Sequence, residues 1–178
     1  MTTEQAKPEE TPNLTPGVFG QFLAEHDISS TRLPDSTGVE TIEVTTANLE
    51  MALKRLRNSA ETRLDFLVTV SGVDAGDNIE SVYHLWSYEH TKELVIKVRV
   101  PKSQLGADGL ALVPTTSTYW SAANWHERET FDLVGIRYVG HPYMRRILNP
   151  WDWEGYPLRH DYKQPVDALN DKNPFSFR

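Results

Sequence analysis

The chain has 178 residues, a formal net charge of −7 at pH 7 and no cysteine. This length suits one domain with a substantial core, and the acidic charge argues against a nucleic-acid binder that must neutralise phosphates. The lack of cysteine excludes disulfides, thiol nucleophiles, zinc–thiolate sites and cysteine-ligated iron–sulfur clusters. The sequence contains no run of about 18 apolar residues, so no membrane-spanning helix is predicted. The N-terminus lacks the pattern of a signal or transit peptide, which favours a cytosolic chain.

The first part of the chain changes from a polar segment to helical and strand patterns. Residues 1–14 are polar and contain two prolines, so we expect a disordered N-terminal tail. A short amphipathic helix is predicted from Thr15, a good N-cap before a proline, to about His26. A turn-rich link over residues 29–38 and a short strand over residues 39–44 follow.

A second helix is capped by Thr45 or Thr46 and is followed by a strand over residues 64–70. The apolar residues of the helix recur at helical spacing and predict its buried face: Leu49, Ala52, Leu53 and Leu56. The strand alternates between apolar and other positions, which predicts one buried face: Leu64, Phe66, Val68 and Val70.

A hairpin is predicted from two further strands, over residues 81–88 and 94–100. In the second of these strands the inward positions are apolar and the intervening ones are charged: Leu94, Ile96, Val98 and Val100 against Lys97 and Arg99. Residues 101–116 contain two glycines and no periodic pattern, so we expect a long loop there.

The last regular elements are a helix over about residues 121–133, ended by Gly135, and a short strand over residues 136–139. This order of elements favours the α+β class, with helices packed on one face of a mostly antiparallel sheet. We therefore expect one α+β domain over residues 15–140. Residues 141–178 are interpreted as an extended, irregular tail that binds a partner.

The basic and aromatic residues of the chain gather between residues 125 and 162. Residues 1–120 carry 17 acidic and 10 basic side chains, whereas residues 121–178 carry 8 of each. Arg145, Arg146 and Arg159 lie close to Trp and Tyr in segments stiffened by proline, a composition typical of protein interfaces. The alternative, that this stretch is a strap over the chain's own core, stays open, and the two interpretations are compatible.

Carboxylates and histidines of the predicted last helix offer weak catalytic candidates. His126 and Glu127 begin like a zinc-protease HExxH helix, but Thr130 stands where the second histidine is required. Glu127, Glu129 and Asp132 have the chemistry of acid–base residues. A free-standing hydrolase that uses Glu127, Glu129 and His126 is a rival hypothesis. Because no nucleophile with its base accompanies them, the sequence assembles no complete catalytic set.

Two further residue patterns in this region have structural interpretations. Arg128 and Asp132 are four residues apart on the predicted helix and are expected to form a surface ion pair of about 0.3–0.5 kcal/mol. His141 precedes Pro142, and we interpret it as a hydrogen-bonded turn residue rather than a metal ligand.

Four motifs in the same stretch carry a resemblance to a known family. They are ERETFDLVGI at residues 127–136, GHP at 140–142, RRIL at 145–148 and WEGYPLRHDY at 153–162. These motifs resemble the signature of the 30-kilodalton subunit of NADH-quinone oxidoreductase, which is the C subunit of complex I. They are also similar to its close relative, subunit J of the photosynthetic NAD(P)H-quinone oxidoreductase. The resemblance extends over roughly residues 17–165. His160 replaces the lysine that is usual in the family.

The resemblance implies a non-catalytic, cofactor-free structural subunit in the hydrophilic arm of a proton-translocating NADH:quinone oxidoreductase. The implied partners are the hydrogenase-like large subunit and the small cluster-bearing subunit, in a complex that holds iron–sulfur clusters, flavin and quinone. The implied location is peripheral, on the cytoplasmic side of a bacterial inner or thylakoid membrane. A ferredoxin-fed photosynthetic enzyme or a related membrane-bound hydrogenase is the alternative complex.

The resemblance also implies scaffold and partner-interface roles, and no catalytic role, for nine motif residues. They are Glu127, Arg128, Glu129, Asp132, His141, Arg145, Arg146, Arg159 and Asp161.

Overall fold

The computed structural model describes residues 14–35 and 37–163 of the chain. The expected N-terminal tail therefore lies almost wholly outside the described residues, as does the end of the expected C-terminal tail. Residues 141–163 contain turns but no helix or strand, in agreement with the prediction of an irregular segment. No helix in the described part of the chain is both long and apolar enough to cross a bilayer.

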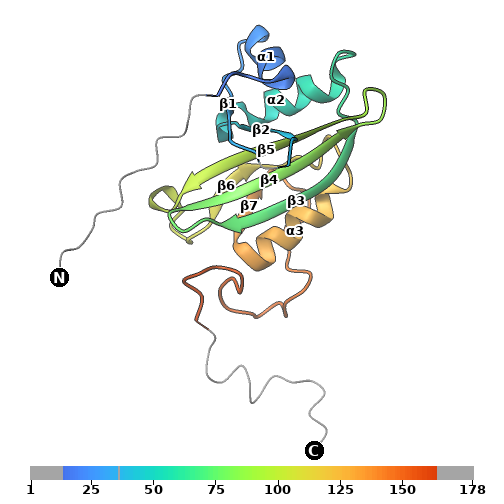
Figure 1. The fold of residues 1–178 in the computed structure, drawn as a ribbon. Coiled ribbons are helices and arrows are strands. Elements are labelled where there is room, and N and C mark those ends of the chain that lie inside the picture. The colour runs from blue at the N-terminus through green and yellow to red at the C-terminus, as the bar shows by residue number, and fades with distance from the viewer. Residues whose placement is uncertain (1–13, 36, 164–178) are drawn as a thin grey trace, which may run out of the picture.

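Five strands form one mixed sheet that runs across the middle of the molecule (Figure 1). They are β1 (Thr31–Arg32), β2 (Glu40–Glu43), β3 (Phe66–Asp74), β4 (Asn78–Ser87) and β5 (Lys92–Pro101). Their order is β1–β2–β5–β4–β3, and all neighbours are antiparallel except β2 and β5. The mostly antiparallel sheet is confirmed, and the link expected over residues 29–38 contains the short strand β1.

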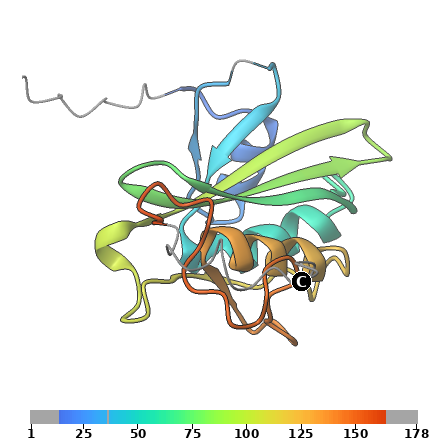
Figure 2. The same cartoon turned by 90° about the horizontal axis from the view of Figure 1, so that it is seen from below.

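One face of the sheet is apolar and carries the helices, as predicted. These are α1 (Val18–Glu25), α2 (Thr46–Asn58) and α3 (Ala123–Val134). Figure 2 shows α2 and α3 on the same side of the sheet, and α1 contacts α2. The side chains buried beneath them alternate along the central strands: Ile79, Tyr83 and Leu85 of β4 with Leu94, Ile96, Val98 and Val100 of β5. The opposite face carries ion pairs, among them Arg99 with Glu80.

The buried face predicted for α2 and the predicted end of α3 are confirmed, but the start predicted for the first helix is wrong. Helix α1 begins at Val18 with Gly17 as its N-cap residue, not at Thr15. Its first N–H groups are bound by the carboxylate of Glu40, a partner that local sequence does not reveal. Thr45 is the N-cap residue of α2, although its side chain makes no capping hydrogen bond. The residues predicted at helical spacing are all buried: Leu49, Ala52, Leu53 and Leu56. Gly135 ends α3 with a φ angle of 77°, a left-handed conformation that favours glycine.

The expectation of a patternless loop over residues 101–116 is wrong. Lys102–Gln104 form a short 3-10 helix, η1, and Ala111–Pro114 form a strand, β6. Strand β6 pairs in parallel with β7 (Ile136–Val139), which confirms the strand predicted at that position. A strand of four residues has too weak a pattern to be recognised alone, because its hydrogen-bond partner lies more than 20 residues further along the chain.

The predicted buried face of β3 is wrong in its first half. Phe66 and Val68 are exposed, whereas Leu67 is buried. The register against β4 shifts between Leu67 and Thr69, so one extra residue bulges out of the ladder. Because a shift of one residue exchanges the two faces of a strand, alternation counted through the bulge assigns the wrong side chains to the core.

Gly72 lets α3 lie close to β3. It is paired with Ser81 of β4, whose side chain is fully buried beneath α3. A Cβ atom at Gly72 would lie 3.2 Å from the Cβ atoms of Thr130 and Val134 and 3.2 Å from Ile136 Cδ1. Since two of these atoms are fixed to the helix backbone, a side chain here must push α3 away from the sheet.

We expect Gly72→Val to lower the free energy of unfolding by about 2 kcal/mol through overpacking between β3 and α3. Urea unfolding of the purified chain measures this change. Ser71→Val is the matched control, because it places the same side chain on the other face of the same strand and should change stability by about 0.5 kcal/mol at most. Equal effects of the two substitutions would contradict the close approach.

Candidate functional site

The carboxylates of α3 lie in different surroundings. Glu127 and Asp132 have no exposed surface, whereas Glu129 is exposed and lines a groove of about 220 Å³ between α3 and β3. The helix therefore directs two of its three acidic side chains into the protein. The hydrogen-bond partners of Glu127 and Asp132 therefore decide whether these carboxylates can take part in chemistry or serve only to hold the fold.

Glu127 holds the segment that follows β6 against α3. Its carboxylate accepts hydrogen bonds from Thr115 Oγ1 at 2.5 Å, from the backbone N–H of Thr116 at 2.6 Å and from Thr116 Oγ1 at 2.7 Å. Burial raises the pKa of Glu127, and these hydrogen bonds oppose that rise only in part. Glu127 is therefore a fully engaged structural group with no access to a substrate.

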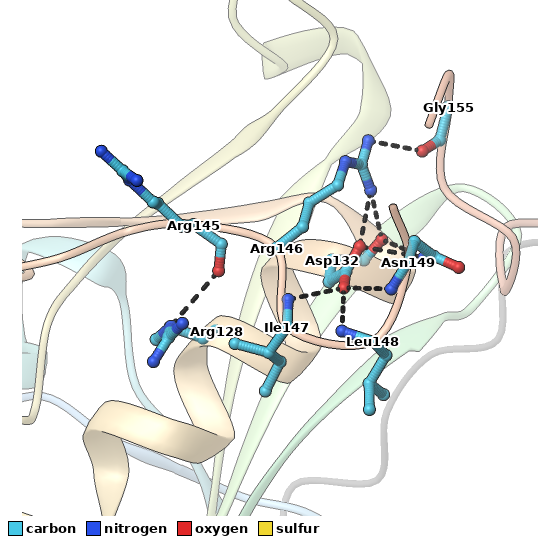
Figure 3. Close-up of polar contacts among 8 residues, drawn as sticks. All are labelled: Arg128, Asp132, Arg145, Arg146, Ile147, Leu148, Asn149 and Gly155. Atoms are coloured by element: carbon cyan, nitrogen blue, oxygen red, sulfur yellow. Dashed lines mark hydrogen bonds and ion pairs between the residues drawn. The ribbon is translucent and has the colours of Figure 1, made fainter. Parts of the chain in front are cut away.

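Asp132 organises the start of the irregular tail (Figure 3). Its Oδ2 atom accepts hydrogen bonds from the backbone N–H groups of Ile147, Leu148 and Asn149 at 2.7–2.9 Å. Its Oδ1 atom accepts from Arg146 Nη1 at 2.7 Å and from Asn149 Nδ2 at 2.9 Å. Burial alone would raise the pKa of Asp132, but these donors, Arg146 first, hold it below its usual value.

The ion pair expected between Arg128 and Asp132 does not form. Asp132 is paired with Arg146, and Arg128 Nε instead donates a hydrogen bond to the carbonyl oxygen of Arg145 at 3.3 Å. Helical spacing places Arg128 and Asp132 on neighbouring turns. The hydrogen-bond donors to the buried carboxylate come instead from residues 146–149, which pack over the helix. A contact with such a later segment cannot be predicted from residue spacing within the helix.

Arg146 links α3 to the next turn of the tail. Besides the bond to the Asp132 side chain, Nη1 donates to the Asp132 carbonyl oxygen at 2.8 Å, and Nη2 donates to that of Gly155 at 2.9 Å. The guanidinium also lies 5.1 Å above the ring of Tyr156. Its position is therefore set on three sides by polar and aromatic contacts.

Arg159 caps the C-terminal end of α3. Its Nε atom donates to the carbonyl oxygen of Val134 at 2.6 Å, and Nη2 donates to those of Gly109 and Gly135 at 2.8 and 3.1 Å. Carbonyls at the end of a helix have no partner within it, and a cation there interacts favourably with the helix dipole. A Cβ atom at Gly135 would lie 2.7 Å from the Tyr156 ring atom Cδ2 and 2.7 Å from Arg159 Nη2, so a side chain here would displace both tail residues from the end of α3.

The remaining tail contacts involve backbone more than side chains. The backbone N–H of His160 donates to Asp74 Oδ2 at 3.0 Å, and Lys102 also pairs with Asp74. The replacement of the usual lysine by His160 therefore leaves this contact intact. Asp161 is exposed and lines a shallow depression beside Lys163.

The prediction that His141 is a turn residue is confirmed. Its Nδ1 atom accepts the backbone N–H of Tyr143 at 3.0 Å, so Nε2 carries the proton and donates to the carbonyl oxygen of Asn124 at 3.2 Å. Both ring nitrogens are thus occupied. In the part of the chain that the structure describes, no group of three acidic or histidine side chains could hold a metal ion.

Several residues of this site were not singled out from the sequence. They are Thr115, Thr116, Asn149, Tyr156, Asp74 and Lys102. Asn149 and Tyr156 lie within or beside the motifs and could have been proposed on that ground. Asp74 and Lys102 lie far from the tail in the sequence, and only the fold brings them to His160. Thr115 and Thr116 follow the unrecognised strand β6, and only the fold brings them to α3.

We expect Asp132→Asn to release the tail, because an amide in place of Oδ1 or Oδ2 turns a donor toward Arg146 or the backbone N–H groups. Loss of one partner of a buried ion pair costs about 3 kcal/mol. Trypsin should then cleave after Arg145 and Arg146 at least about tenfold faster, measured by mass spectrometry of timed digests. Asp161→Asn is the control, because this acid lies exposed in the same tail. Unchanged cleavage in Asp132→Asn would contradict the anchoring role.

The lowered pKa of Asp132 also predicts a pH dependence. A carboxyl group whose pKa is depressed by folding stabilises the folded state above its unfolded pKa of about 3.9, and that contribution is lost as pH falls through the folded value. The raised pKa of Glu127 has the opposite sign and partly offsets the loss. Chemical unfolding across this acidic range should show a steeper decline for the native chain than for Asp132→Asn. Identical slopes would refute the assignment.

Comparison with known proteins identifies the family. The model of the family described as "Respiratory-chain NADH dehydrogenase, 30 Kd subunit" matches residues 42–167. NAD(P)H-quinone oxidoreductase subunit J of a Synechococcus species is 36% identical over 161 residues, which cover 84% of each chain. The C subunit of NADH-quinone oxidoreductase from Chloroherpeton thalassium is 42% identical over 110 residues, which cover 61% of this chain and 43% of that protein.

A solved structure shares the fold. One chain of the membrane-bound sulfane sulfur reductase, an archaeal respiratory membrane complex, superposes with a TM-score of 0.67 and 22% identity, covering 90% of this chain and 92% of that chain. The matches to two C subunits span about half the length of those relatives, 43% in one and 59% in a Roseiflexus protein. The family model and the subunit J match each cover most of the chain, which belongs to the family of the 30-kDa subunit of respiratory-chain NADH dehydrogenase, or complex I.

Proposed function

We propose that the chain is a structural subunit of the hydrophilic arm of a proton-translocating NADH:quinone oxidoreductase, without a catalytic centre or cofactor of its own. The observation that carries this proposal is the state of Glu127 and Asp132. Both carboxylates are buried and fully occupied by donors from this chain. They build a surface and have no free oxygen for chemistry, which also weighs against the free-standing hydrolase.

The surface built in this way would bind partner subunits through residues 141–178. In its described part, anchored at Asp132 and at Arg159, the tail exposes large apolar side chains: Leu148 and Leu158 at about 60% and Trp151 at 91%. Exposed apolar groups beside fixed arginines are typical of protein contacts. Of the nine motif residues, Asp132, Arg146 and Arg159 would hold the tail, and Glu127 would hold the segment after β6 against α3. The other five would face or border partners: Arg128, Glu129, His141, Arg145 and Asp161.

Family membership supports the choice of partners and location. The partners would be the hydrogenase-like large subunit and the small cluster-bearing subunit, in a complex containing iron–sulfur clusters, flavin and quinone. The chain would lie peripherally, on the cytoplasmic side of a bacterial inner or thylakoid membrane. Relatives named as subunits of NADH-quinone and NAD(P)H-quinone oxidoreductases support a place in such an enzyme.

A ferredoxin-fed photosynthetic enzyme is the second candidate complex. The observation in its favour is the match to a subunit J, which is 36% identical over 161 residues. A membrane-bound hydrogenase related to complex I would use the chain in the same structural role. The co-purified subunits discriminate among these: NADH-binding flavin subunits, ferredoxin-type adaptors, or a nickel site in the large subunit.

The first experiment is a pull-down of tagged chain from membranes in mild detergent, followed by mass spectrometry. Recovery of the hydrogenase-like and cluster-bearing subunits with iron–sulfur absorbance would support the structural role. Recovery of the chain alone, soluble and monodisperse, would refute it, because the tail would then close on its own core.

We expect Arg159→Ala and Arg146→Ala to lower the amount of assembled complex severalfold while turnover per assembled complex changes little. Each substitution removes three hydrogen bonds that position the tail, two of them to the C-terminal part of α3 and its cap residue Gly135. Arg137→Ala is the control, because this arginine lies exposed on β7 and pairs with Asp108. Native gels give the amount and NADH–quinone assays the turnover. Full assembly with almost no turnover would overturn the structural role.

A further inference from the structure

Two consecutive arginines of the tail point in opposite directions. Arg146 reaches inward to Asp132, whereas the side chain of Arg145 extends away from that cluster (Figure 3). The guanidinium of Arg145 lies 4.6 Å above the ring of Tyr143, on the exposed side of the tail. Arg146 is thus used to hold the tail, and Arg145 is left at the surface.

Arg145 is one end of a stack that alternates guanidinium groups and aromatic rings. Arg128 lies 4.8 Å from the ring of Trp125 and 5.5 Å from the ring of Tyr143, so it is placed against both. The hydrogen bond from Arg128 Nε to the Arg145 carbonyl oxygen ties the α3 side of the stack to the tail side. We call Trp125, Arg128, Tyr143 and Arg145 the arginine–aromatic ladder.

Within the described residues, the two arginines of the ladder have no carboxylate partner. Four other arginines each have a carboxylate oxygen within 3.0 Å: Arg63, Arg99, Arg137 and Arg146. Four more have no carboxylate partner among the described residues: Arg32, Arg55, Arg57 and Arg159. Among residues 14–35 and 37–163, no carboxylate lies within ion-pair distance of Arg128 or Arg145. This is so in a chain whose net charge is −7.

The geometry of the stack defines what could bind there. Ring contacts use the flat face of a guanidinium and restrict its motion, while its N–H edge stays available for bidentate hydrogen bonds to a carboxylate. Trp125 and Tyr143 are 63% and 50% exposed, so they add apolar area around the charges. Two cations on an acidic chain are too few for stable attachment to an anionic membrane, which takes a cluster of basic residues.

We propose that the arginine–aromatic ladder binds an acidic segment of a neighbouring subunit, with Asp or Glu carboxylates on Arg128 and Arg145. This inference rests on the proposed structural role and specifies the chemistry of one contact within it. The ladder thereby differs from the apolar part of the tail, which would bind through Leu148, Trp151 and Leu158.

The test uses carbodiimide cross-linking of the complex in membranes, which joins only an amine and a carboxylate that are in contact. Arg128→Lys and Arg145→Lys keep the positive charge and introduce the amine. Arg137→Lys is the matched control, because Arg137 lies 3.0 Å from Asp108 of the same chain, so an amine at this position should link within the chain. Comparison with the unaltered chain removes links formed by native lysines.

We expect mass spectrometry to find the amine introduced by Arg128→Lys or by Arg145→Lys joined to an Asp or Glu of a co-purified subunit. If the complex assembles and the control link forms, but neither variant links to another subunit, the inference is overturned and the structural role stands. That outcome includes an anionic lipid on the ladder, because a lipid supplies no Asp or Glu of another subunit to which the amine could be joined. A link to a second copy of this chain also overturns it. Recovery of the chain without other subunits overturns both proposals.

Discussion

The buried Asp132 carboxylate is the interaction on which the rest of this structure depends. The segment after β7 forms no helix or strand, so its backbone N–H groups lack the regular partners that secondary structure supplies. Three consecutive N–H groups, an amide and a guanidinium converge on Asp132 instead. Arg159 in turn donates hydrogen bonds to carbonyl oxygens at the end of α3 that have no partner within the helix. An irregular tail thus acquires one defined path across a regular helix.

The same arrangement explains how charged motif residues can serve a structural subunit. A carboxylate that accepts hydrogen bonds on both oxygens, inside the protein, is unavailable for proton transfer to a substrate. Its energetic role is to hold neighbouring segments in place. Residues of the tail that face outward then present aromatic, aliphatic and guanidinium groups from an anchored segment, which in the proposed structural role would lower the entropic cost of binding a partner.

Local patterns predicted much of the fold but only part of the site. The buried face of α2 followed from helical spacing, and Gly135 followed from its place after the last apolar residue of α3. The face of β3 was misassigned because a bulge exchanges the two sides of a strand, and composition does not reveal a bulge. Strand β6 was missed because parallel pairing with β7 gives a four-residue segment its structure.

The sequence by itself determined the class of fold, the end of α3 and the motifs that mark the family, because each depends on short-range spacing or on residues read in one stretch. The tertiary structure alone decided the roles of residues within those motifs. Asp132 binds Arg146 rather than Arg128, and Arg145 turns outward while Arg146 turns in. Which donor satisfies a buried carboxylate depends on the path of the chain over the helix. That path is set by long-range packing, so it is absent from local sequence periodicity.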